Sequence, residues 1–491
     1  MNTSGSMNAD AFARLYQRLL EIDFFGRAGE ALPPRSALAR AVNDGANMLP
    51  FEYLHGYAEP LERNLGRLLY RAQAFGPPYL MPLEVLTGSV YQHRNGSSSP
   101  RPLNRFLAVI SDLYRSFLDK AKRKAADVPI VQTVPPLAMF LHDGQSGPLT
   151  LPNDKVKEEI GVRIGAVALP ATYADHPLTW AALAHETGGH DVTHADPGLL
   201  PELEAKVATA LAGMPTPRGI SRDLLAQLWA YWMDEASADV YGLLNIGPSM
   251  AANLAVFFAA FGAQQERRGR PHAPSLRMES RFDPRDPMAV LDPHPTTILR
   301  LHLLAGVVDT LTGLSQESRD RYGHMIDDLA SKLATGSYVT ITGNIPSPFN
   351  PTWIDVRVPL AEMQQTARNA GGFIATARLA ALGGRSIQDI ETWDNSDETR
   401  AIDVKNAVLA GRPIANLGDD AQLLAGVTLA LLERPELYDA ATQALNDGLD
   451  LSFRNDPIWG APQPEAISMI YDAYPPGEHH ERRAPEHEPA V

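Results

Sequence analysis

Residues 185–190 read H-E-T-G-G-H, and this hexapeptide decides how the centre of the chain has to fold. Its two imidazoles, His185 and His190, lie five residues apart. Because a regular α-helix advances roughly 100° per residue, this spacing splays the side chains by about 140°. A π-bulge takes up one extra residue and returns both side chains to one face, and such bulges often occur at functional sites. Gly188 and Gly189 favour an irregular backbone, since glycine adapts to non-ideal geometry. The hexapeptide therefore predicts a helix that is bulged between the two histidines.

A second, acidic hexapeptide supplies a third candidate ligand. Residues 234–239 read D-E-A-S-A-D. Catalytic zinc typically takes three protein ligands, of which two histidines and one glutamate are a common set, and keeps a fourth position for water. The two histidines and Glu235 match that set. Glu186, directly after the first histidine, is of the right type to accept a proton from such a water.

Together the two hexapeptides resemble the motifs of the dipeptidyl-peptidase III family, in which H-E-x-x-G-H is paired with E-E-C-R-A-E. The resemblance implies a zinc metallopeptidase of the gluzincin type. It would make His185, His190 and Glu235 the zinc ligands and Glu186 the catalytic glutamate. Aspartates stand at both ends of the second motif where the family has glutamates, and Ala-Ser replaces its Cys-Arg. The resemblance covers the two motifs only.

A third element resembles the CAAX-processing zinc peptidases and their soluble relatives, which carry a histidine-proline pair and an arginine after an E-x-x-x-D helix. Residues 292–295 read D-P-H-P, and Arg300 follows. The resemblance implies that His294 hydrogen-bonds the oxyanion of a tetrahedral intermediate, a strong electrostatic effect in a water-poor site. Asp239 lies one helical turn beyond Glu235, where it can hydrogen-bond a ligating histidine. Arg300 is expected to pair with Asp239 or to orient the cleft.

Two alternatives stay open. His194 follows His190 by four residues, so His185, His190 and His194 could form a three-histidine site for zinc or iron that does not need Glu235; otherwise His194 supports the site or lines the cleft. A different class is a catalytically silent zinc scaffold that binds peptides or a partner protein. Glu186 argues against the scaffold, because a structural zinc site is normally closed by a fourth protein ligand.

Apolar patterns around the motifs predict their supporting elements. A strand is expected over 162–169, at the edge of a cleft, where an extended peptide could add by backbone hydrogen bonds. The second motif is expected inside one helix from about 223 to 245, and 250–263 reads as a buried helix. An acidic pair in the middle of such an apolar helix would need a compensating cation.

Composition restricts the class of partner. The chain has 491 residues, a formal charge of −15 and no cysteine. The negative charge argues against nucleic acid and anionic membranes, and the lack of cysteine excludes disulfides and thiolate ligands. The N-terminus lacks the pattern of a secretory signal, and no apolar run reaches about 18 residues. We therefore expect a cytoplasmic protein without membrane insertion, acting on a peptide or protein substrate.

The expected fold is mainly α (α+β). A zincin-like catalytic core, with a small sheet and the bulged metal-binding helix, is expected over residues 151–335. Mostly helical regions are expected over 1–150 and 336–475. The Pro-, Glu- and His-rich end, 476–491, reads as a disordered tail.

Overall fold

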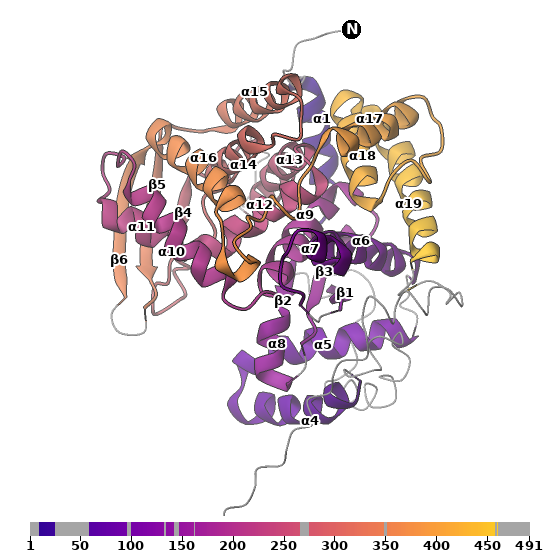
Figure 1. Ribbon diagram of the computed structural model, residues 1–491, viewed down its shortest axis with the longest axis horizontal. Helices are drawn as coiled ribbons and strands as arrows, with labels where there is room; N and C mark the ends of the chain where they lie inside the picture. Colours follow the sequence, from indigo (N-terminus) through magenta and orange to yellow (C-terminus); the bar gives the residue numbers. More distant parts are fainter. Residues whose placement is uncertain are drawn as a thin grey trace, which may run out of the picture.

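A computed structural model describes residues 9–24, 58–95, 100–131, 134–141, 147–161, 163–265, 274–347, 351–456 and 459. The described chain is mainly helical with two small sheets, which confirms the expected mainly α (α+β) class (Figure 1). The expected tail over 476–491 lies outside the described residues. None of the helices in the described part of the chain combines the length and apolar character needed to cross a bilayer.

The first sheet lies beside the motif helix and has the strand order β1-β3-β2. Its strands are β1 (Leu137–Leu141), β2 (Leu149–Leu151) and β3 (Ala166–Pro170). All five residues of β3 are buried, as expected for a strand covered on both faces. β3 pairs in parallel with β1 and antiparallel with β2. The strand expected over 162–169 therefore begins later, at Ala166. Because β3 is the central strand of the described sheet, a peptide cannot add to it by backbone hydrogen bonds as expected, whereas β2 is an edge strand.

The second sheet consists of β4 (Glu279–Arg281), β5 (Tyr338–Ile345) and β6 (Thr352–Pro359), in that order. β5 and β6 pair antiparallel along their whole length, and α10 and α11 lie near this sheet in Figure 1. β4 lies inside the long connection that leads to the His-Pro element.

Four segments form the centre of the molecule. They are α9 (Ala181–His185), the π-helix η4 (Glu186–Asp191), α12 (Met233–Ile246) and α14 (Thr297–Thr310). α12 packs against each of the other three. α14 is buried from Ile298 to Val308, so it is surrounded by protein on all sides.

The helix expected over 223–245 is interrupted. α11 (Arg222–Tyr231) ends before Trp232, and α12 begins after it. Trp232 is buried and its indole Nε1 donates to the Asp292 carbonyl at 3.3 Å, so a tertiary contact holds the break. The acidic motif consequently begins in the first turn of α12. There the helix dipole stabilises carboxylates, so a cation would have to supply only part of the compensation that we expected for an acidic pair in mid-helix.

The remaining elements surround this centre. The helices are α1 (Ala9–Leu20), α4 (Ala58–Phe75), α5 (Pro77–Asn95), α6 (Pro100–Leu118), α7 (Lys120–Ala125), α8 (Asn153–Ile160), α10 (Leu199–Ala212), α11 (Arg222–Tyr231), α13 (Ser249–Gln265), α15 (Gln316–Leu333), α16 (Leu360–Thr376), α17 (Asn395–Leu409), α18 (Asp420–Glu433) and α19 (Tyr438–Asn455). Short 3₁₀ turns are η2 (Ala171–Tyr173), η3 (Pro177–Trp180), η5 (Ala380–Leu382) and η6 (Pro435–Leu437). α13 matches the buried helix expected over 250–263.

One hydrophobic core includes residues from all three regions expected from the sequence, 1–150, 151–335 and 336–475. Its buried side chains run from Phe12 to Leu449, and a smaller cluster lies between α4, α5 and the first sheet. The boundary expected at residue 150 falls within β2, because β1 and β2 pair with β3.

Candidate metal centre

The backbone between the two motif histidines is a π-helix, as their spacing predicts. α9 ends at His185, and η4 continues through His190 to Asp191. Hydrogen bonding from i to i+5 places residues five apart on one face. The two imidazole rings lie with their centroids 4.8 Å apart, nearly perpendicular at 88°.

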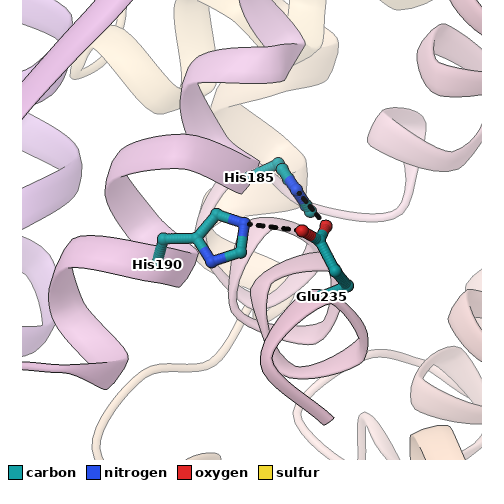
Figure 2. Close-up of side chains that lie close together, drawn as sticks. All are labelled: His185, His190 and Glu235. Atoms are coloured by element: carbon teal, nitrogen blue, oxygen red, sulfur yellow. Dashed lines mark ion pairs between the residues drawn. The ribbon is translucent and has the colours of Figure 1, made fainter. Parts of the chain in front are cut away.

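Glu235 completes a three-residue group. Its Oε2 lies 3.1 Å from His185 Nε2, and its Oε1 lies 3.6 Å from His190 Nε2. Figure 2 shows both rings directed at this carboxylate, which comes from the neighbouring helix α12. One ligand atom from each residue lies within 4.8 Å of the others, so the group could hold a metal ion.

The state of Glu235 supports that fit. Oε2 is buried and makes no hydrogen bond of acceptable geometry, although an imidazole nitrogen is close to it. Leaving a buried carboxylate oxygen without a donor is costly. Two imidazole nitrogens and a carboxylate are also a donor set that suits zinc. The residues present therefore fit a zinc ion.

His185 is held by a buried ion pair. Its Nδ1 lies 3.0 Å from Asp239 Oδ1, which leaves Nε2 facing Glu235. Arg300, on α14, donates to both oxygens of Asp239 at 2.7 Å. Burial works against the charged carboxyl, but Arg300 and the histidine outweigh it and lower the pKa of Asp239. The expected pairing of Asp239 and Arg300 is thus present, and it fixes the orientation of one imidazole.

His190 is held in the same way by Asp234, a role that we did not assign from the sequence. Nδ1 of His190 lies 3.0 Å from Asp234 Oδ1. The signal was available, because Asp234 and Asp239 are the two ends of the acidic hexapeptide and lie on the same helix as Glu235. Each motif histidine therefore has its own aspartate partner on α12.

His194 does not join the ligand group. Its Nε2 contacts Asp234 at 3.3 Å, and its Nδ1 contacts Asp154 at 2.9 Å. Burial opposes the imidazolium form, but these two carboxylates outweigh it and raise the pKa of His194 to about 9. His194 therefore contacts the aspartate that holds His190. This position agrees with the supporting role expected for His194 and not with a three-histidine ligand set. Asp154 lies on α8, and nothing in the motif spacing indicates it.

The catalytic candidate Glu186 lies at the start of η4 beside β2. It is buried, and Thr150 of β2 donates its hydroxyl to Glu186 Oε2 at 2.7 Å and contacts the Glu186 carbonyl oxygen at 3.1 Å. Thr150 comes from a three-residue strand, and the sequence gives no sign that it reaches the motif. The contact joins the edge strand to the candidate general base.

A cleft of about 660 Å³ opens beside the group and is lined by His185, Glu186, His294 and Arg300. His294 is 42% exposed; its Nδ1 contacts Asp292 Oδ1 at 2.7 Å, and its Nε2 lies 3.2 Å from Glu235 Oε1. His294 is not part of the group whose ligand atoms all lie within 4.8 Å of one another, so that group has three candidate ligands. Apolar side chains of α13 form another part of the lining: Leu254, Phe257, Phe258 and Phe261.

The structure thus brings together every residue that the motifs indicated, with His185, His190 and Glu235 as the candidate ligands and the others around them. Comparison with known proteins adds nothing to this geometry, since no family model, no curated protein and no solved structure matches the chain.

Proposed function

We propose that the protein is a zinc-dependent peptidase that hydrolyses peptide bonds, with Glu186 as general base and then general acid. The observation that carries the proposal is a three-ligand group of which His185 lines the same cleft as Glu186, a buried glutamate outside that group. A closed structural zinc site would have four protein ligands and no use for such a glutamate. The two motifs resemble those of gluzincins in sequence, and the proposal rests in addition on how their residues are arranged in space.

A zinc ion held by His185, His190 and Glu235 would supply Lewis-acid activation of water and polarisation of the substrate carbonyl. Glu186 takes the proton of the attacking water and returns it to the leaving amine. Thr150 donates to the Glu186 carboxylate and so orients it.

His294 is exposed to the cleft and is oriented by Asp292 through Nδ1. Its Nε2 points away from Asp292 and lies 3.2 Å from Glu235 Oε1, at the edge of the ligand group. From there it can donate a hydrogen bond to the oxyanion that forms at the scissile carbonyl, in place of its contact with Glu235. Asp239 and Asp234 hold the two ligand imidazoles with Nε2 turned toward Glu235, which pre-organises the group.

Two features favour a peptide as substrate. β2 pairs with β3 on one side only among the described strands, and an extended peptide can add to such an edge by backbone hydrogen bonds. The apolar lining from α13 then offers a place for a large apolar side chain of the substrate.

The test is zinc content by elemental analysis, together with cleavage of a mixed peptide library. Wild type and Glu186→Gln should each carry about one zinc per chain, and only wild type should cleave, because the substitution removes the base and leaves the ligands. The expected loss in rate is about 10²–10⁴-fold. Zinc without cleavage by wild type would instead support the scaffold.

The ligand assignment has its own control. Glu235→Ala should lose zinc, whereas His194→Ala should keep it, because His194 contacts Asp154 and Asp234 outside the ligand group. The reverse result would support the three-histidine site.

A further inference from the structure

His294 is linked through Asp292 to Arg277, a residue that none of the motifs contains. Arg277 Nη1 donates to Asp292 Oδ2 at 2.6 Å, and His294 Nδ1 contacts Asp292 Oδ1 at 2.7 Å. All three residues line the cleft beside the candidate metal centre. Arg277 lies 15 residues before Asp292 in the chain, so the spacing of the His-Pro element gives no sign of it.

The Asp292 carboxylate is bonded through both of its oxygens. Oδ2 accepts from Arg277, and Oδ1 accepts from the backbone N–H of His294 at 3.0 Å as well as facing its ring. Burial works against the charged carboxyl, but the His294 hydrogen bond and the Arg277 charge outweigh it and lower the pKa of Asp292 to about 2. Asp292 is therefore ionised at neutral pH, and His294 Nδ1 has to carry the proton of the hydrogen bond between them.

The backbones of Arg277 and Asp292 are held by different helices. The N–H of Arg277 donates to Oγ1 of Thr297, the first residue of α14, at 2.7 Å. The carbonyl of Asp292 accepts from the indole of Trp232, the residue before α12, at 3.3 Å. α12 carries Glu235 and packs against α14. The ion pair thus joins backbone segments whose positions the centre of the molecule already fixes.

This ion pair is too exposed to contribute much to folding. Arg277 is 39% exposed and Asp292 is 18% exposed. Solvent screens such a pair, and holding a long side chain in one geometry costs entropy. The other arginine in the cleft lining, Arg300, differs because it is buried and bonded to both oxygens of Asp239. We therefore expect the main effect of Arg277 in the cleft and not on stability.

We propose that Arg277 is a positioning residue, which holds the Asp292 carboxylate so that His294 Nε2 is directed at the oxyanion. This role rests on the proposed function, in which His294 donates to that oxyanion. Nε2 lies 3.2 Å from Glu235 Oε1, at the edge of the ligand group. Oxyanion stabilisation depends on where the donor is placed, and a misplacement of about 1 Å can cost about 10²-fold in rate.

The experiment measures kcat and KM of the zinc-loaded full chain on a peptide from the library. Arg277→Gln should lower kcat by about 10–100-fold with KM and zinc content unchanged, because it removes the contact to Asp292 and touches no ligand. Arg277→Lys should recover most of the rate, since the contact uses one donor and lysine also supplies a charged donor.

Arg281→Gln is the matched control. It makes the same change on an arginine of β4 that is paired with Glu279 and does not line the cleft, so it should keep the kcat of wild type. An equal loss of kcat in Arg277→Gln and Arg281→Gln would overturn the proposal.

A double-mutant cycle separates positioning from other effects. His294→Gln should lower kcat by about 10²–10³-fold. Adding Arg277→Gln to that variant should cause no further loss, because Arg277 acts only through His294. Losses that multiply would overturn the proposal and mean that Arg277 contacts the substrate itself or supports the fold.

A second readout does not depend on cleavage. In protein labelled with ¹⁵N-histidine, the proton on His294 Nδ1 should give an NMR signal, which His294→Gln identifies by its absence. Arg277→Gln should broaden this signal, because a mobile Asp292 protects the proton less from exchange with water, and Arg277→Lys should keep it. No such signal in wild type, or an unchanged signal in Arg277→Gln, would overturn the proposal. A signal that depends on Arg277 in a protein that cleaves no peptide would support the positioning of His294 and overturn the peptidase function.

Discussion

Gly189 lies where η4 crosses α12, and its replacement by alanine tests how the metal centre is assembled. A Cβ atom at Gly189 would lie 2.3 Å from the Cα of Ala238, 2.4 Å from its Cβ and 2.8 Å from its carbonyl oxygen. Non-bonded carbon atoms are best separated by about 3.5–4.0 Å. Because the contacted atoms include backbone, no rotamer change relieves the clash, and the two segments have to separate by about 1 Å.

Moving η4 and α12 apart should lower both the stability of the protein and its affinity for zinc. Overpacking a core costs about 1–3 kcal/mol, and a clash between two backbones belongs at the upper end. Ala238 lies three residues after Glu235 on the same helix, so the shift also moves His190 away from the Glu235 carboxylate. Metal–ligand distances hold to within about 0.2 Å, so we expect zinc affinity to fall by at least about 10–100-fold, the range seen for lost outer contacts.

Gly188 supplies the matched control one residue away. A Cβ there would meet only the Asn245 side chain, with Nδ2 at 3.1 Å and the next atoms at 3.9 Å. A side-chain amide can move by a few tenths of an ångström, so Gly188→Ala should cost less than about 1 kcal/mol and keep zinc. Thermal unfolding and zinc content after dialysis against a weak chelator measure both effects. Equal melting temperatures and equal zinc content in the two variants would refute the reasoning.

Three further substitutions test titratable side chains, two of which the fold buries. Asp239→Asn should destabilise the protein by about 3 kcal/mol and release zinc, because it leaves the Arg300 guanidinium buried without its carboxylate. Asp234→Asn changes a side chain that is 40% exposed and should cost less than about 1 kcal/mol. Denaturant unfolding compares the two variants, and equal costs would contradict this account. His302→Gln should flatten the acid dependence of stability, because burial lowers the pKa of His302 to about 4. Since the unfolded value is about 6.5, the stability contributed by neutral His302 is present above pH 6.5 and is lost as the pH falls toward 4, by about 3 kcal/mol in all. Unfolding curves of both proteins across that range check this, and parallel pH dependences would show the prediction to be wrong.

The centre of the site was predictable because its constraints are local. The five-residue spacing of His185 and His190 permits one metal only with an extra residue in the helix, and η4 provides it. Asp239 follows Glu235 by one turn, so its position on the same face also follows from helix geometry. These inferences need the dihedral angles of one helix and no knowledge of which elements pack together.

The rest depends on contacts between segments that the sequence does not pair. Thr150 and Asp154 reach the site because β2 is the antiparallel partner of β3 and α8 follows it, and no residue pattern fixes that order. The break at Trp232 has the same origin, since a carbonyl 60 residues away receives its indole N–H. Apolar periodicity continues through the break, and for that reason it predicted a single helix.

The sequence drew attention to the two motif glycines, but it explained only part of why glycine is needed there. The sequence suggested that they relax the backbone of a bulged helix. In the structure, the requirement at Gly189 is the close approach of α12, whose Ala238 occupies the space that a side chain would need. The two hexapeptides are therefore matched by backbone packing as well as by shared ligand chemistry. The buried ion pair of Asp239 and Arg300 joins α12 to α14. The positions of the three ligands are therefore set by the packing of η4, α12 and α14, and a metal ion would bind to a geometry that the protein already holds.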